Sequence, residues 1–158
     1  MKLSNTFKFI ISIVVAQGAG LIGSIFTTPN IPVWYATIIK PSWVPPSYIF
    51  APVWTLLFFL MGVALFLVWK RGIKVEKAKF AIVLFSIQLV LNIFWSVLFF
   101  GLQNPGAAFI EIVALWIFIF LTIIYFAKVS KIAAWLLVPY IAWVSFASIL
   151  NYSIWILN

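Results

Sequence analysis

Five long apolar runs constrain the fold of this chain more than any other feature. They contain 18 to 26 residues each, and the only charged residue within them is Glu111. About 20 apolar helical residues cross the ~30 Å hydrocarbon layer of a bilayer, so each run is long enough to span it. The runs are continuous and lack the alternation of barrel strands. We therefore predict an all-α integral membrane protein, a bundle of five transmembrane helices. The predicted helices are 9–26, 48–69, 80–101, 107–127 and 132–157.

The composition agrees with a chain whose solvent is lipid. Hydrophobic residues make up 66% of the 158 residues and charged residues 8%, whereas soluble domains have about 45–50% and ~25%. We expect one membrane domain over residues 1–158. Lys2 and Lys8 precede the first run as they would in a signal peptide, but the run continues past Gly18 to Phe26, which favours a transmembrane helix.

The basic residues predict the orientation in the membrane. With five helices, the N-terminus, the second connection and the fourth connection share one face. Nine of the ten positive residues lie there, and only Lys40 lies on the other face. The nine are Lys2, Lys8, Lys70, Arg71, Lys74, Lys77, Lys79, Lys128 and Lys131. The positive-inside rule therefore predicts a cytoplasmic N-terminus and an outside C-terminus. The net charge of +8 suits anionic headgroups of the lipid bilayer, and we expect no nucleic acid partner.

Several classes of active site are excluded by the residue types present. The chain has no Cys, His or Asp, and its two acids are Glu76 and Glu111. A Ser-His-Asp triad, a His/Cys zinc site and a His- or Cys-ligated haem are therefore ruled out, and we predict no metal site and no tightly bound cofactor. We expect Glu111, near a helix N-terminus, to reach water or headgroups. Aromatic residues make up 20% of the chain, so recognition would rest on stacking and shape.

The first connection, residues 27–47, holds five of the eight prolines. Because proline fixes φ and lowers the entropic cost of ordering, we expect this loop to be ordered and to act as a lid.

Three of the predicted helices carry aromatic or polar residues on one face. In the second helix Phe50, Trp54 and Phe58 recur every four residues, which fits either ordinary packing or a pocket wall. In the third helix Gln88, Asn92 and Trp95 share a face. Unpaired amides are costly in hydrocarbon, so this face either makes interhelical hydrogen bonds or lines a cavity.

The fifth predicted helix combines a proline with a second candidate wall. Trp143, Ala147 and Leu150 share one face, and Pro139 precedes them. Proline in a helix frees a carbonyl one turn earlier and favours a kink, which would make room beside Trp143.

Small residues recur every four positions in the first helix. Ala16, Gly20 and Ser24 form one such series, and Ala19 and Gly23 form another. This pattern lets helix backbones approach closely, either within the bundle or between protomers.

Two uncommon strings carry a family resemblance. One runs from Trp34 to Pro46 and reads WYATIIKPSWVPP, and the other runs from Asn92 to Gly101 and reads NIFWSVLFFG. Together with PVWT at 52–55 and PYIAWVSFASILN at 139–151 they distribute the match along the chain from residue 34 to residue 151. The sequence resembles the TspO/translocator protein family, the tryptophan-rich sensory proteins also known as peripheral-type benzodiazepine receptors.

The resemblance implies a membrane receptor or sensor, and a homodimer. Its ligands would be porphyrins, such as protoporphyrin IX, and related flat hydrophobic molecules, held in an aromatic intramembrane pocket. It also raises the expectation of light-dependent porphyrin degradation, with Trp54 and Trp143 as photochemical residues. The alternatives are a translocator of porphyrin or lipid-like molecules and a membrane scaffold subunit without a ligand. The ligand-binding residues expected from the motif match and the helical faces are Trp34, Tyr35, Phe50, Trp54, Phe58, Asn92, Trp95, Trp143, Phe146, Ala147 and Leu150.

Overall fold

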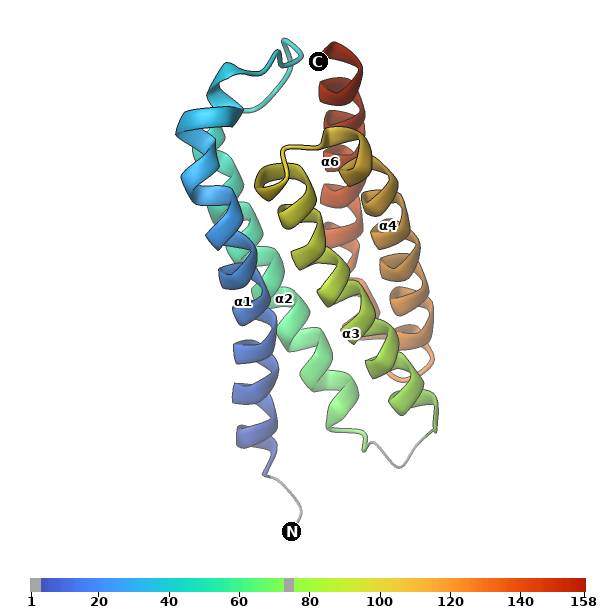
Figure 1. The fold of residues 1–158 in the computed structure, drawn as a ribbon. Helices are drawn as coiled ribbons and strands as arrows, with labels where there is room; N and C mark the ends of the chain where they lie inside the picture. The colour runs from blue at the N-terminus through green and yellow to red at the C-terminus, as the bar shows by residue number, and fades with distance from the viewer. Residues whose placement is uncertain (1–3, 73–75) are drawn as a thin grey trace.

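The computed structural model describes residues 4–72 and 76–158, and the regular structure in these ranges is helical (Figure 1). Five helical spans are long and apolar enough to cross a membrane, which confirms the predicted fold class. They are Asn5–Tyr35, Ser47–Trp69, Glu76–Gly101, Pro105–Ala127 and Lys131–Leu157.

The first span is longer than the sequence predicted. Helix α1 covers Asn5–Asn30 with Pro29 inside it, and a π-helical turn, η1, continues it over Ile31–Tyr35. The expectation of a loop beginning at residue 27 was therefore wrong. A π turn accommodates an additional residue per turn, so the widened segment tolerates Pro32 where a regular helix would break. The connection without helix is confined to the residues between Ile38 and Pro46.

The remaining elements are described by their bounds. They are the 3-10 turn η2 (Ser47–Ile49), α2 (Phe50–Trp69), α3 (Glu76–Ser96), the π-helical turn η3 (Val97–Gly101), α4 (Pro105–Ala127), α5 (Lys131–Leu136) and α6 (Val138–Leu157).

The predicted interruption before Pro139 is confirmed. Helix α5 ends at Leu136, α6 begins at Val138, and the Leu137 N–H donates to the carbonyl of Ala134 over 3.1 Å. Pro139 then occupies the first turn of α6, where a missing N–H leaves no bond unmade. The fifth span is therefore two helices joined at Leu137.

The spans form a closed ring of neighbours. Helix α1 packs against α2 and α3, α3 packs against α4, and α4 packs against α5 and α6, while α2 completes the ring against α5. Figure 1 shows the C-terminus of α6 at the same end as the connection between α1 and α2, with the N-terminus at the opposite end. We call the end that carries the connection between α1 and α2 the loop end, and the end at which α1 begins the basic end.

The small residues of α1 are used inside the bundle. A Cβ added at Gly20 would lie 2.6 Å from the ring of Phe58, and one at Gly23 would lie 3.1 Å from Ser96 Oγ. From the facing helix, a Cβ at Gly62 would lie 2.9 Å from the Cα of Ile13. Close approach of α1 to α2 and α3 therefore requires these small residues, which favours the intramolecular use of the pattern.

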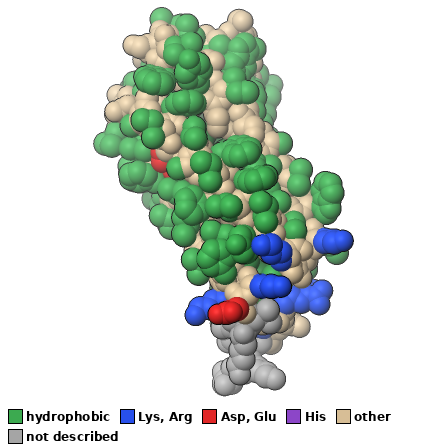
Figure 2. Space-filling view, turned by 90° about the vertical axis from the view of Figure 1, so that its right-hand side faces the viewer, with side chains coloured by type: hydrophobic (Ala, Val, Ile, Leu, Met, Phe, Trp, Pro, Cys, Tyr) green, Lys and Arg blue, Asp and Glu red, His purple; other side chains and the backbone are tan. Residues whose placement is uncertain are grey.

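Positive charge gathers at the basic end. Lys70, Arg71, Lys77, Lys79 and Lys128 are exposed near the turns that join α2 to α3 and α4 to α5. Figure 2 shows these blue side chains collected at one end, with hydrophobic side chains covering much of the rest of that face. Lys2 and Lys74 of the predicted basic set lie outside the described residues.

Glu111 differs from its predicted environment. Its side chain is only 8% exposed, and neither carboxylate oxygen has a hydrogen-bond partner within residues 4–72 and 76–158. The expectation that it reaches water or headgroups was therefore wrong. It shares the inward face of α4 with Ala108 and Leu115, and this face is buried.

Candidate functional site

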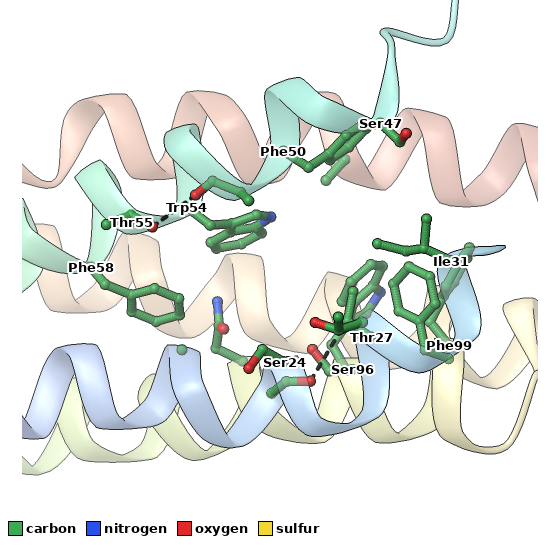
Figure 3. Close-up of a pocket in the computed structure, with 18 of the residues that line it drawn as sticks. Ser24, Thr27, Ile31, Ser47, Phe50, Trp54, Thr55, Phe58, Ser96 and Phe99 are labelled. Carbon is green, nitrogen blue, oxygen red and sulfur yellow. Dashed lines mark hydrogen bonds between the residues drawn. The ribbon is translucent and has the colours of Figure 1, made fainter.

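A cavity of about 280 Å³ lies in the loop-end half of the bundle (Figure 3). Its walls come from α1 with η1, from η2 with α2, from α3 with η3, and from α6. Figure 3 shows Trp54 and Phe58 extending from α2 toward α1, with Phe99 and Ile31 at the other end of the space. The cavity therefore brings together segments that are far apart in the sequence.

Most of the predicted ligand-binding residues line this cavity. They are Tyr35, Phe50, Trp54, Phe58, Asn92, Trp95, Trp143, Ala147 and Leu150. Trp34 and Phe146 stand behind the wall. Trp34 packs edge-on against Phe99 at 5.4 Å, and Phe146 contacts Trp43 and Trp143 at 5.9 and 5.2 Å between ring centroids. These two rings support wall residues and do not themselves face the cavity.

The α1 wall was missed by the sequence reasoning. Gln17, Gly20, Ser24, Thr27 and Ile31 line the cavity at spacings of three and four residues. Because small residues at such spacings also mark helix packing, we had interpreted this face as a packing surface alone. Polar groups on this face could have indicated a cavity wall, since helix packing does not require them. They are the hydroxyls of Ser24 and Thr27 and the amide of Gln17.

The cavity is open toward the lipid between α1 and α2. Leu21, Thr28, Ala51 and Thr55 line it and are also exposed. Below this opening Gln17 Nε2 donates to the carbonyl of Thr55 over 3.0 Å and joins the two helices. A hydrophobic molecule in the bilayer would therefore meet part of the cavity without crossing the bundle.

Aromatic rings set the shape of the remaining walls. Trp95 is stacked on Phe99 with 5.0 Å between centroids and 20° between planes. Trp54 lies over Phe58 at 5.6 Å, and Phe50 meets Trp143 edge-on at 5.8 Å. Such an arrangement offers flat apolar faces to a flat ligand.

Trp95 is held by an asparagine on α6. Its Nε1 donates to Asn151 Oδ1 over 2.9 Å, and Asn151 Nδ2 donates to the carbonyl of Pro105 over 2.7 Å. Asn151, which itself lines the cavity, thereby ties α3, α4 and α6 together at the cavity wall. The indole of Trp95, which lines the cavity, is oriented by this bond.

The amides of α3 meet one tyrosine. Asn92 Nδ2 donates to Tyr140 Oη over 2.9 Å, and Tyr140 Oη donates to Gln88 Oε1 over 2.8 Å. Tyr140 is 1% exposed, so the chain of bonds is inside the bundle. The two interpretations of this α3 face both hold, because Asn92 makes an interhelical bond and also lines the cavity.

Trp143 leaves a polar group unpaired. Its Nε1 is buried and has no hydrogen-bond partner in the part of the chain that the structure describes. Trp143 lines the cavity, one turn before Ala147 on α6. A buried indole N–H is usually paired, so this unpaired donor is an exception, although the nitrogen itself presents almost no surface to the cavity.

The cavity is lined by apolar and polar side chains. Its polar groups are hydroxyls, side-chain amides and indoles. In the ranges 4–72 and 76–158 no three His, Cys, Asp or Glu side chains come together in a metal-binding arrangement.

Comparison with known proteins assigns the family. The TspO/MBR family model matches residues 11–156. The chain belongs to the TspO/MBR family. It is 53% identical over 139 residues to the tryptophan-rich protein TspO of Chlorobaculum tepidum, covering 88% of each chain. It is 45% identical over 154 residues to the protein of the same name from Archaeoglobus fulgidus, covering 98% of this chain and 99% of the relative. It is 41% identical over 123 residues to the translocator protein of Homo sapiens, covering 77% and 73%. This TspO/MBR family member is thus a multi-pass integral membrane protein, as the apolar runs predicted.

Proposed function

We propose that this protein binds porphyrins and related flat hydrophobic molecules in the cavity between α1, α2, α3 and α6. The observation that carries the proposal is the cavity itself, in which the indoles of Trp54, Trp95 and Trp143 stand beside hydroxyl and amide side chains. A porphyrin has a flat face for stacking and carboxylate oxygens that accept hydrogen bonds. Ala147, one turn from Trp143, leaves room for a ring where a larger side chain would fill the space.

The size of the cavity limits how the ligand sits. Small-molecule sites usually have volumes of about 300–1,000 Å³, and this cavity of about 280 Å³ is just below that range. We expect a macrocycle to place one edge against Trp54, Trp95 and Trp143 and to extend the opposite edge between α1 and α2. The exposed lining residues Thr28 and Thr55 flank that route.

Light-dependent degradation of the bound porphyrin is part of the proposal. The proposed step is a single electron transfer, in which the photoexcited porphyrin gains one electron and the indole of Trp54 or Trp143 loses one. Dioxygen would then act as the oxidant that breaks the porphyrin ring. Indole is suited to the donor role because it is oxidised far more easily than a phenyl ring.

The alternatives are a translocator and a scaffold without a ligand. One relative of Homo sapiens is named a translocator protein, and one of Cereibacter sphaeroides, 33% identical, is named a tryptophan-rich sensory protein. We favour binding followed by sensing or conversion, because the cavity offers polar donors and stacking faces.

Orientation and assembly complete the proposal. We propose that the basic end faces the cytoplasm, since Lys70, Arg71, Lys77, Lys79 and Lys128 gather there.

We also propose a homodimer. Because the small residues of α1 already pack against α2 and α3, the dimer would use another lipid-facing surface.

Titration of the purified protein with protoporphyrin IX in nanodiscs, in the dark and under illumination, tests the proposed function. We expect saturable quenching of tryptophan fluorescence in the dark and loss of the porphyrin absorption band in the light. Trp135→Phe is a suitable control, since Trp135 is 72% exposed and outside the cavity. Absence of saturable binding would favour the scaffold alternative, and binding without light-dependent loss would leave a sensor or a translocator.

A further inference from the structure

The side chain of Asn158 pairs with the backbone of the loop that joins α1 to α2. The Ile39 N–H donates to Asn158 Oδ1 over 2.9 Å, and Asn158 Nδ2 donates back to the Ile39 carbonyl over 3.0 Å. The second hydrogen on Nδ2 points to the carbonyl of Ile154, 2.8 Å away on α6. The Asn158 side chain therefore uses its carbonyl oxygen as an acceptor and its amide nitrogen as a donor to two carbonyls.

The two hydrogen bonds between Asn158 and Ile39 join the loop to α6, whereas the side-chain bonds of Lys40 stay within the loop and the end of its own helix. Lys40 Nζ donates to the carbonyls of Tyr35 and Ile38, at 2.6 and 2.9 Å, and so fixes the loop to the end of its own helix. Within the part of the chain that the structure describes, the Asn158 pair supplies the hydrogen bonds between residues 38–46 and α6. Apolar contacts add to these bonds: the Trp43 ring contacts Phe146, and Ile38 and Val44 pack against the cluster that contains Leu150 and Ile154 of α6.

The pair lies directly beyond the end of the cavity. Ile154 lines the cavity, and Asn158 is one helical turn farther along α6. Tyr35 lines the cavity from the α1 side, and its carbonyl is one of the two that accept a hydrogen bond from Lys40 Nζ. The loop between these points therefore passes across the loop end of the cavity, where Figure 1 shows it beside the C-terminal end of α6.

A primary amide has the geometry that this pairing needs. The N–H and the C=O of one backbone residue require an acceptor and a donor side by side, and the side chains of Asn and Gln carry both. Asp keeps the acceptor and loses the donor, and Ala loses both. Asn158 is also exposed at the end of α6, so its replacement should leave the packing of the bundle unchanged.

We propose that Asn158 is a positioning residue that holds residues 38–46 across the loop end of the cavity and keeps water-soluble molecules out of it. Breaking the pair frees the loop to swing away from α6, and the cavity then opens to water at that end. The opening between α1 and α2 remains for molecules dissolved in the bilayer. The consequence for ligand exchange rests on the proposed binding function, whereas the closure itself does not.

A cysteine in the cavity reports closure without any ligand. The chain has no native cysteine, so Ala147→Cys in nanodiscs can be labelled with 2-sulfonatoethyl methanethiosulfonate, a charged thiol reagent that does not cross lipid. We expect Asn158→Ala to accelerate this labelling roughly tenfold, the factor that corresponds to ~1.4 kcal/mol of lost hydrogen bonding. Asn158→Asp should give a rate between the two.

Matched controls separate opening from general loosening. Asn104 lies at the same end and pairs with its own helix, accepting from the Ala107 N–H over 3.0 Å, so Asn104→Ala should leave the labelling rate unchanged. A cysteine at exposed Ser42 should react equally fast in every background. Equal rates at Ala147→Cys with and without Asn158→Ala would overturn the proposal, as would equal acceleration by Asn104→Ala.

Hydrogen exchange and ligand kinetics extend the test. The Ile39 amide should be protected in the unmodified protein and exchange about tenfold faster in Asn158→Ala. If protoporphyrin IX binds, its association and dissociation should both accelerate in Asn158→Ala, with a Kd that changes less than the rates. Unprotected Ile39 in the unmodified protein contradicts the closure, whereas failure of porphyrin to bind contradicts the proposed function and leaves the labelling result intact.

Discussion

Replacement of Tyr140 by Phe should destabilise the bundle through two amides at once. The Tyr140 hydroxyl accepts from Asn92 and donates to Gln88, and the ring itself is 1% exposed. Tyr140→Phe removes a single oxygen and leaves the packed ring in place. Asn92 Nδ2 and Gln88 Oε1 then both lose their partner inside the bundle.

The expected cost follows from the two lost bonds. Interhelical hydrogen bonds in membranes average about 0.6 kcal/mol and reach about 1.7 kcal/mol, so two of them amount to roughly 1–3.5 kcal/mol. Because the freed amide groups stay buried, we expect a value of about 2–3 kcal/mol in the upper part of this range. Reversible unfolding in mixed micelles of increasing SDS fraction, followed by circular dichroism, measures this difference.

Two further variants make the reasoning refutable. Tyr152→Phe removes a hydroxyl from a ring that is 44% exposed, and it should change the unfolding free energy by less than about 0.5 kcal/mol. Gln88→Leu combined with Tyr140→Phe should cost less than the sum of the single variants, since the double variant leaves no unpaired Gln88 carbonyl. Equal stability of Tyr140→Phe and the unmodified protein, or strict additivity in the double variant, would show that the bonds contribute nothing.

Three other changes test the cavity, the buried acid and the orientation. Trp54→Phe and Trp143→Phe should each keep porphyrin affinity within about tenfold, or ~1.4 kcal/mol, but strongly slow its loss under illumination, and equal rates at matched occupancy in the double variant would contradict the photochemical role. Glu111→Met should raise the unfolding free energy by about 1–4 kcal/mol, because it replaces a buried carboxylate without a partner by an apolar side chain of similar size, and a large destabilisation in the same SDS assay would show that the carboxylate is bonded. Single cysteines at Ser42 and Arg71 in intact cells should be labelled and protected, respectively, by an impermeant reagent, and the reverse pattern would invert the proposed orientation.

The number and position of the spans could be predicted from the sequence, whereas the length of the first could not. Apolar runs of bilayer length leave little choice for a chain in lipid. Pro29 and Pro32 favoured a loop from residue 27 because proline usually ends a helix. The π-helical turn Ile31–Tyr35 overcomes this local preference, and nothing in a single sequence distinguishes it from a helix end.

The candidate site was predictable where large aromatic side chains mark it. Trp54, Trp95 and Trp143 stand on helix faces whose spacing is visible in the sequence, and all three line the cavity. Ser24 and Thr27 line it as well, but small polar residues have several uses in membrane helices. The pairing of Tyr140 with two α3 amides depends on the relative rotation and height of α3 and α6, which periodicity within one helix does not specify.

The π-helical turn η3, Val97–Gly101, makes the cavity sensitive to chain length. A π turn in an α-helix holds one residue more than the regular turn it replaces, and each residue of an α-helix advances the direction of the side chain by about 100°. Deleting a single residue between Val97 and Gly101 would therefore rotate the side chains that follow it about the helix axis. A substitution keeps the number of residues in the turn and causes no such rotation. Phe99 and Phe100, both buried within this turn, could not both keep their places. A relative that is one residue shorter here would build a different wall from the same amino acids.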